Sequence, residues 1–162
     1  TPFNQPIGVW NVGNVVDMSN MFWNSREFNQ DISAWNVSNV VSMWSMFYNA
    51  PFNQPLGSWD VSKVNNMSTM FGGTPFNRDI SSWEVSNVTN MDFLFYGSSF
   101  NQDISFWHVS NVTTMRYMFA ESSFNQNLSA WDVVNVSECE LFSDNTPDWT
   151  LPKPNFTNCD PN

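Results

Sequence analysis

Hydrophobic and polar positions recur along this chain with a nearly constant period. A Phe-Asn pair marks each repeat at positions 3, 28, 52, 76, 100 and 124, so the intervals are 25, 24, 24, 24 and 24 residues. A fixed period of this length is typical of repeat proteins, in which each copy buries its apolar face against its neighbours. The pattern therefore predicts one continuous stack of about six 24-residue coils.

The apolar spacing within one repeat predicts two kinds of element. In the second copy, three residues at i, i+3 and i+5 fit the strand of a leucine-rich-type repeat: Ile32, Trp35 and Val37. Four later residues have helical spacing, which favours a short helix or 3₁₀ segment: Val40, Met43, Met46 and Phe47. The predicted fold class is an α/β repeat, a leucine-rich-repeat-like solenoid with one parallel β-sheet face and one short-helix or 3₁₀ face.

Comparison of the copies with one another separates core from surface positions. The Trp, Val, Met and Phe registers keep their apolar character, so we expect them in the core. The asparagine after each Phe never changes, which predicts a buried ladder of amides that bond to backbone groups of the turn and the next coil. Its members are Asn4, Asn29, Asn53, Asn77, Asn101 and Asn125. A role for these asparagines in ligand binding is the alternative.

The position between Trp and Val varies most from copy to copy. In the last five copies it is occupied by Asn36, Asp60, Glu84, His108 and Asp132. Strand alternation directs this row away from the core, onto the same face as Phe106. A constant core with a variable outer face is how repeat proteins present extended binding surfaces. We call these five residues between Trp and Val the variable row. The alternative to a binding surface is a solvated face whose residues vary without a role in binding.

Charge narrows the choice of partners. Five Lys and Arg oppose 15 Asp and Glu, which gives a formal net charge of −10. Nucleic acid is not expected as a partner, because it requires a basic surface that displaces counterions. An anionic membrane surface is disfavoured for the same reason, and no apolar run is long enough to insert into a membrane. The opening Thr1–Asn4 matches the interior Thr74–Asn77, which predicts that the chain starts inside a repeat without an N-terminal cap.

The sequence contains no recognisable catalytic arrangement. His108 has Glu84 and Asp132 in the same register one coil away, but a general base also needs a nucleophile and an oxyanion site. We therefore expect no enzymatic activity and no cofactor. Carboxylates that alternate with proline in one register predict turns rather than a metal site, with one weak calcium site as the alternative: Asp31, Asp79 and Asp103.

The C-terminal segment departs from the repeat and contains both cysteines. A disulfide between Cys139 and Cys159 would hold residues 143–162 as a cap over a six-coil stack at residues 1–142. Such a bond indicates an oxidising compartment, whereas two unpaired thiols are the alternative. Seven Asn-x-Ser/Thr sequences are candidate glycosylation sites: Asn36, Asn66, Asn87, Asn111, Asn127, Asn135 and Asn155. Asn87, Asn111 and Asn135 share a register with Lys63, which predicts that they are exposed.

The repeat resembles the BspA-like leucine-rich surface repeat, a family of mycoplasma lipoproteins, other bacteria and protists. The resemblance rests on the segments 28–40 and 100–115, which follow the pattern FNQDIS-x-W-x-VSNVT-x-M. It implies a secreted or surface-displayed protein involved in adhesion or recognition. We therefore expect an extracellular or cell-surface module that binds a protein or glycan through the variable row. The alternative is a structural building block, in which copies stack end to end into a filament or wall layer.

Overall fold

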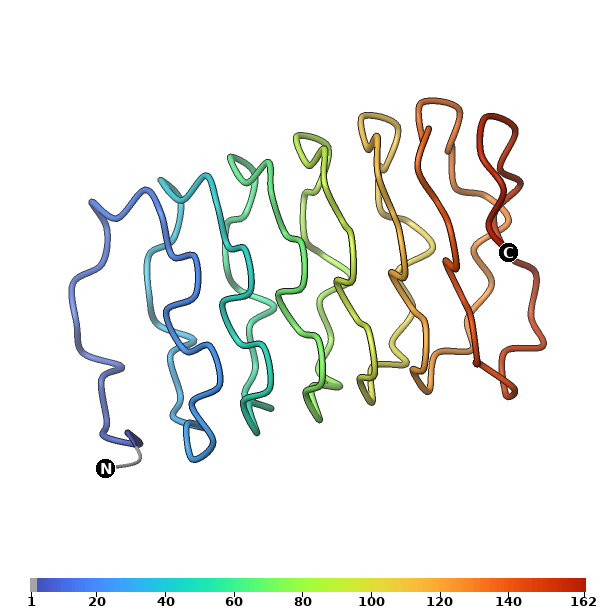
Figure 1. The fold of residues 1–162 in the computed structure, drawn as a ribbon. Helices are drawn as coiled ribbons and strands as arrows, with labels where there is room; N and C mark the ends of the chain where they lie inside the picture. Colours follow the sequence, from blue (N-terminus) through green and yellow to red (C-terminus); the bar gives the residue numbers. More distant parts are fainter. Residues whose placement is uncertain (1–2) are drawn as a thin grey trace.

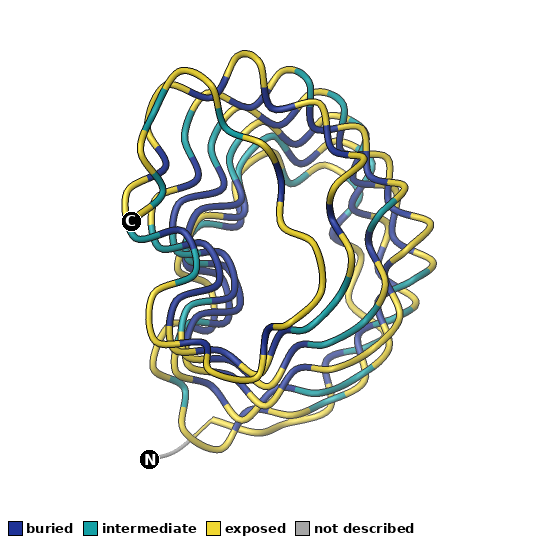
Figure 2. Ribbon diagram, turned by 90° about the vertical axis from the view of Figure 1, so that its right-hand side faces the viewer, coloured by how far each residue is buried: buried dark blue, intermediate teal, exposed yellow. Residues whose placement is uncertain are grey.

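The computed structural model describes residues 3–162. Thr1 and Pro2, on which the expected start inside a repeat partly depends, lie outside the described residues. The chain winds in successive coils that stack along one axis, from the N-terminal coil to the C-terminal tail (Figure 1). Viewed nearly along that axis, the coils lie over one another and enclose a common interior (Figure 2).

The predicted α/β fold class is wrong. Residues 3–162 contain no helix and no extended strand, so the stack has neither a parallel β-sheet face nor a short-helix face. The strand-like contacts in this part of the chain are isolated parallel bridges between neighbouring coils: Asp17–Ser42, Ser42–Asn66, Asn66–Asn90, Asn90–Thr114 and Thr114–Glu138. Each coil is otherwise a succession of turns joined by short irregular stretches.

The segment predicted as a helix, Val40–Phe47, forms consecutive turns because its amides alternate between two kinds of partner. The amide of Met46 donates to the carbonyl of Met43 at 3.1 Å and closes a turn. The amide of Phe47 donates to the carbonyl of Met70 in the next coil at 3.0 Å. An α-helix would direct both amides to carbonyls four residues back in the same segment. Bonding to the neighbouring coil therefore replaces the helix.

Left-handed backbone conformations recur at intervals of four residues in these turns. Each coil has one pair of them, and the first and second members of the pairs form two columns along the stack. The pairs are Asn20 and Asn24, Ser45 and Asn49, Thr69 and Gly73, Phe93 and Gly97, Tyr117 and Glu121, Leu141 and Asn145. A left-handed residue interrupts right-handed helical winding and costs an L-residue about 1–2 kcal/mol. Hydrogen bonds between coils offset this cost, because in the first five pairs each left-handed residue donates its amide to the next coil.

The Trp-x-Val segment, predicted as a strand, is a short irregular stretch between two turns. The amide of Trp35 donates to the carbonyl of Ile32 at 3.0 Å, and the amide of Val40 donates to the carbonyl of Val37 at 2.8 Å. Neighbouring coils are joined here through side chains. The indole Nε1 of Trp59, for example, donates to the carbonyl of Ile32 in the preceding coil at 3.2 Å. This bond satisfies the polar atom of a buried Trp and repeats in every later coil.

The predicted core registers are confirmed by burial. The side chains in the predicted Phe, Met, Trp and Val registers are buried apart from exceptions in the first copy, and the Phe side chains of these registers form two stacked columns. Within one coil the rings of Phe47 and Phe52 stack with centroids 4.0 Å apart, and Phe52 stacks on Phe76 of the next coil at 6.3 Å. Trp10 is an exception with 52% exposure, because no described coil covers its outer side.

The asparagine ladder exists but lies at the surface, which corrects the prediction that it is buried. Asn29 and Asn77 are exposed, and Asn53 is half-buried. The Oδ1 of Asn29 accepts the backbone amide of Asn53 at 2.9 Å, and the Oδ1 of Asn53 accepts that of Asn77 at 3.1 Å. The side chain lies beside the backbone it bonds to, at the rim of the coil, where solvent reaches it. The predicted bonding to backbone of the next coil is confirmed.

The C-terminal tail lies against the last coil and is tied to it by the predicted disulfide. Cys139 and Cys159 are bonded across a sequence separation of 20 residues, and Cys139 is fully buried in the register of the core methionines. Trp149 packs edge-on against Phe119 and Phe124, with ring centroids 5.3 and 4.8 Å apart. The tail thus covers the last aromatic layer. The division at residue 142 into two units stays a prediction.

The ladder predicts a stability difference between two substitutions at one position. Asn77→Ala removes the acceptor for the backbone amide of Asn101 and for the Gln102 side chain. We expect a loss of about 1 kcal/mol in the free energy of unfolding, the usual net value of a hydrogen bond. Asn77→Asp keeps the acceptor oxygen and should remain near wild type. Urea unfolding measures both; equal stability of the Ala variant and wild type would contradict the ladder's role.

The disulfide predicts that reduction loosens the tail. The chain-entropy relation for a loop of this length gives a contribution of about 3 kcal/mol. Cys159→Ser should therefore lower the urea midpoint and expose Trp149, which red-shifts tryptophan fluorescence. Reductant should have the same effect on the wild type and none on the variant. An unchanged urea midpoint in the variant would show that packing alone holds the tail.

Candidate binding face

The variable row lies on the surface, as the sequence predicts. Asn36, Asp60, Glu84, His108 and Asp132 are all exposed in successive coils. The acceptor oxygens of this row are oriented by the backbone at four of the five positions. The Oδ1 of Asp60 accepts the amide of Ser62 at 3.1 Å, and the Oε1 of Glu84 accepts that of Ser86 at 3.0 Å. The same turn recurs at Asn36 and Asp132, where the partners are Ser38 and Val134.

These hydrogen bonds keep the row acidic. The hydroxyl of Ser62, followed by its amide, lowers the pKa of Asp60, with a small contribution from Lys63. The amide of Ser86, followed by its hydroxyl, lowers the pKa of Glu84, and the charge of nearby His108 lowers it slightly further. Hydrogen bonds to a carboxylate stabilise its ionised form. Exposed carboxylates are ionised at neutral pH in any case, and the lowered pKa of both groups extends their ionised range to more acidic pH. The centre of the row therefore has negative charge.

Phe106 stands beside a hollow on this face. Its side chain is 81% exposed, and it borders a cleft of about 350 Å³ together with Leu151, which is 42% exposed. Asp103 and Gln126 add polar atoms to the lining. An adjoining hollow of about 180 Å³ includes His108, Asp132 and Ala130, and Ala130 borders both. The C-terminal half of the row is thus concave, and the larger hollow has apolar surface from Phe106, Ala130 and Leu151 among mostly polar residues.

Leu151 and Gln126 are site residues that sequence reasoning missed. Leu151 belongs to the tail, where comparison between repeats gives no register. Its place is determined by the last asparagine of the ladder, because the Oδ1 of Asn125 accepts the amides of Thr150 and Leu151 at 3.0 and 3.1 Å. In the sequence, the one indication of this contact is that Asn125, the last residue of the ladder, has no following repeat to bond to.

The candidate glycosylation sites differ in the state of their amide nitrogen. Six are exposed and Asn66 is half-buried. The Nδ2 atoms of Asn87, Asn111 and Asn135 donate to carbonyls of the preceding coil at 2.7–2.8 Å. Attachment of a sugar to that nitrogen would compete with the bond between coils. Glycosylation stays a prediction at all seven positions: Asn36, Asn66, Asn87, Asn111, Asn127, Asn135 and Asn155.

The register of Asp31, Asp79 and Asp103 has the predicted turn role. Each Oδ1 accepts the amide of the serine two residues later at 2.9 Å. In the described part of the chain, no three His, Cys, Asp or Glu residues converge on a point that could hold a metal ion. Nor does any helix within residues 3–162 have the length and apolar character needed to cross a membrane.

Comparison with known proteins identifies one family. A family model described as "Mycoplasma protein of unknown function, DUF285" matches residues 1–75 and residues 51–150. The two matches together cover every repeat of the stack. The comparison with curated proteins and the comparison with solved structures gave no match.

The turn-capping carboxylates predict a specific dependence of stability on pH. The amide and hydroxyl of Ser81 lower the pKa of Asp79, so the unfolded chain binds a proton more readily than the native chain. This stabilisation is complete above the unfolded pKa of about 4 and disappears as pH falls through the lower native pKa. Asp79→Asn keeps an acceptor oxygen without the titration.

The variant should therefore lose less stability than wild type between about pH 5 and pH 3, as measured by urea midpoints. The comparison is made between variants because acidification also relaxes the repulsion due to the net charge of −10. A variant that loses as much stability as wild type would show that the Asp79 turn does not contribute to acid sensitivity.

Proposed function

We propose that this chain, which belongs to the DUF285 family of Mycoplasma proteins, is a non-enzymatic recognition module that binds a protein or glycan through the variable row. The observation that carries the proposal is the contrast between a core repeated coil after coil and an exposed row whose residues change along the stack. Repeat proteins vary one face in this way to fit a partner.

The proposed contact centre is Phe106. A large aromatic side chain that is 81% exposed beside a concave surface has the properties of a binding anchor. Binding energy in interfaces is concentrated in such anchors, which fill a pocket on the partner while surrounding contacts exclude water. The hollow between Phe106 and Leu151 would in turn accept a side chain or sugar ring from the partner.

The acidic part of the row supports a partner that is hydroxyl-rich or positively charged. Asp60 and Glu84 are oriented by turns and stay ionised, so they add attraction for basic groups without a cost for reorienting them. Such charges affect the rate and specificity of binding more than its strength. Phe106 and its hollow would supply most of the affinity.

An extracellular or cell-surface location is part of the proposal. The disulfide supports it, because such bonds persist in oxidising compartments. The resemblance of the repeat to the BspA-like surface repeat supports both adhesion and surface display. A structural building block remains the second proposal, since backbone amides join identical registers of neighbouring coils and a second copy could offer the same register. A monomer at high concentration in analytical ultracentrifugation would contradict the second proposal.

Binding through the variable row predicts which substitutions weaken adhesion. Fluorescent beads carrying the protein would be applied to glycan arrays and to cultured cell layers. Phe106→Ser and the paired charge reversal Glu84→Lys with Asp132→Lys should each reduce retention by about tenfold, equivalent to the loss of one anchor. Trp44→Ser provides a matched control, because Trp44 is 46% exposed and lies outside the row.

Retention that falls equally in the control would mean that the beads attach by general stickiness. Retention that survives both row substitutions would remove the row as the binding site. Either result would leave the surface location to be tested separately, by mapping the disulfide and any glycans on protein from its natural source.

A further inference from the structure

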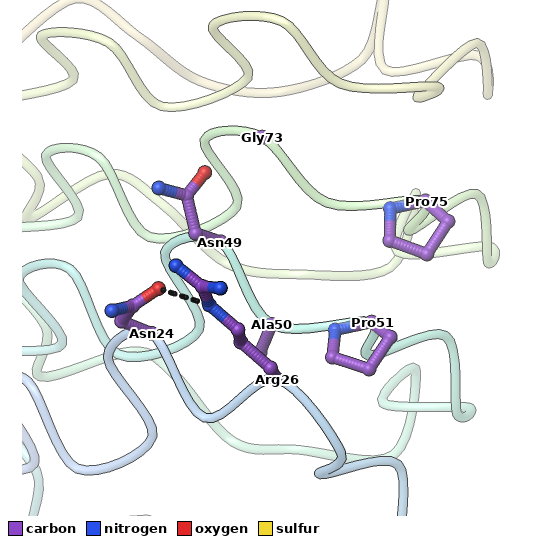
Figure 3. Close-up of a pocket in the computed structure, with 7 residues that line it drawn as sticks. All are labelled: Asn24, Arg26, Asn49, Ala50, Pro51, Gly73 and Pro75. Carbon is purple, nitrogen blue, oxygen red and sulfur yellow. Dashed lines mark hydrogen bonds between the residues drawn. The ribbon is translucent and has the colours of Figure 1, made fainter.

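A second cleft, larger than those of the variable row, lies away from that row at the corner of the first three coils. It measures about 480 Å³ and is widely open to solvent. One side has the amides of Asn24 and Asn49, and the other has the rings of Pro51 and Pro75 (Figure 3). The guanidinium of Arg26 lies near the two amides (Figure 3).

Arg26 lies in a stretch where the first coil has one residue more than the others. Three residues separate Asn24 from Phe28, whereas two separate Asn49 from Phe52. Asn24 and Asn49 have the same left-handed conformation, with φ of 52° and 55°, so the first two coils match in backbone at this position despite the extra residue. The longer stretch, Ser25 to Glu27, is accommodated at the surface; it places the cationic Arg26 in the lining of the cleft, with the exposed Glu27 next to it in the chain.

Gly73 shapes the wall of the cleft. Its φ is 65°, and a Cβ placed on it would lie 2.2 Å from the Oδ1 of Asn49. Glycine at this position therefore leaves room for the Asn49 amide to lie against the next coil. The Oδ1 of Asn49 is directed toward Gly73, and this amide lines the cleft (Figure 3).

Arg26 is the Lys or Arg residue of the described chain with the least engaged head group. Its one hydrogen bond runs from Nε to the Oδ1 of Asn24 at 3.4 Å, and the ion pairs within residues 3–162 belong to Arg116. The others donate at 2.6–3.0 Å to protein acceptors; they are Lys63, Arg78, Arg116 and Lys153. The two terminal nitrogens of Arg26 are therefore available to an anion in the cleft.

We propose that this cleft binds the carboxylate of an acidic sugar, such as a uronate residue of a polysaccharide. A guanidinium matches a carboxylate with two parallel hydrogen bonds, which a single hydroxyl cannot offer. The amides of Asn24 and Asn49 can exchange hydrogen bonds with ring hydroxyls. The exposed proline rings provide apolar surface for the C–H face of a sugar. The site is separate from the variable row and does not depend on the function proposed for it.

Titration of the full chain with sodium glucuronate, followed by amide NMR spectra, tests this site. We expect shifts at Asn24, Asn49 and Gly73, with glucose and acetate binding about tenfold more weakly because each lacks one half of the ligand. Arg26→Gln should weaken glucuronate binding by about tenfold or more. Arg78→Gln is the matched control, since Arg78 is exposed and its Nε donates to the carbonyl of Asn53.

Phe106→Ser should leave glucuronate binding unchanged, which separates this site from the variable row. The proposal is overturned if Arg26→Gln binds as wild type, or if Arg78→Gln is impaired equally. It is also overturned if acetate binds as well as glucuronate, because the sugar would then contribute nothing. Tighter binding of a glutamate-containing dipeptide than of glucuronate would assign the cleft to acidic peptides instead. Dispersed spectra of each variant would show that it is folded.

Discussion

Hydrogen bonds from alternate backbone amides to the next coil are the constraint on which the rest of the structure depends. Each coil can make them only if every second amide leaves the plane of its own turn, and left-handed residues at four-residue intervals provide that geometry. The remaining amides then close turns within the coil. Bonds of this kind need an identical register in the neighbouring coil, so the constant period follows from the backbone as well as from the core.

The apolar pattern predicted the core but not the backbone that carries it. Spacings of three and four residues suit a helix, yet successive turns closed by i to i+3 hydrogen bonds place Met43, Met46 and Phe47 on one side just as well. The residue types in the two columns of left-handed positions do not predict that conformation clearly. Asn49 and Gly73 are natural left-handed residues, but others in the same columns, such as Phe93 and Leu141, are not. Tertiary bonding imposed the conformation on them.

The candidate sites were likewise predictable where the repeat pattern determines their position and unpredictable where tertiary bonding does. The exposure of the variable row could be predicted because it lies between two buried registers, Trp and Val, in every coil that has a neighbour on both sides. The cleft beside Phe106 could not, because Leu151 reaches it from a tail that has no repeat register. Its position depends on Asn125, whose side chain bonds to the tail as other ladder residues bond to the next coil.

Chemical variety therefore arises where the repeat can vary without breaking bonds between coils. The ladder asparagine and the Trp whose indole joins coils keep their residue type in every copy, whereas the row between Trp and Val only needs a side chain compatible with a turn. The insertion at Arg26 follows the same logic, since it lies just beyond the amide of Asn24, the last bond to the second coil in that run of turns. An extra residue there changes the surface of the coil and leaves the backbone hydrogen bonds between the first two coils intact. Both candidate sites thus lie at positions that can change without breaking the hydrogen bonds between coils.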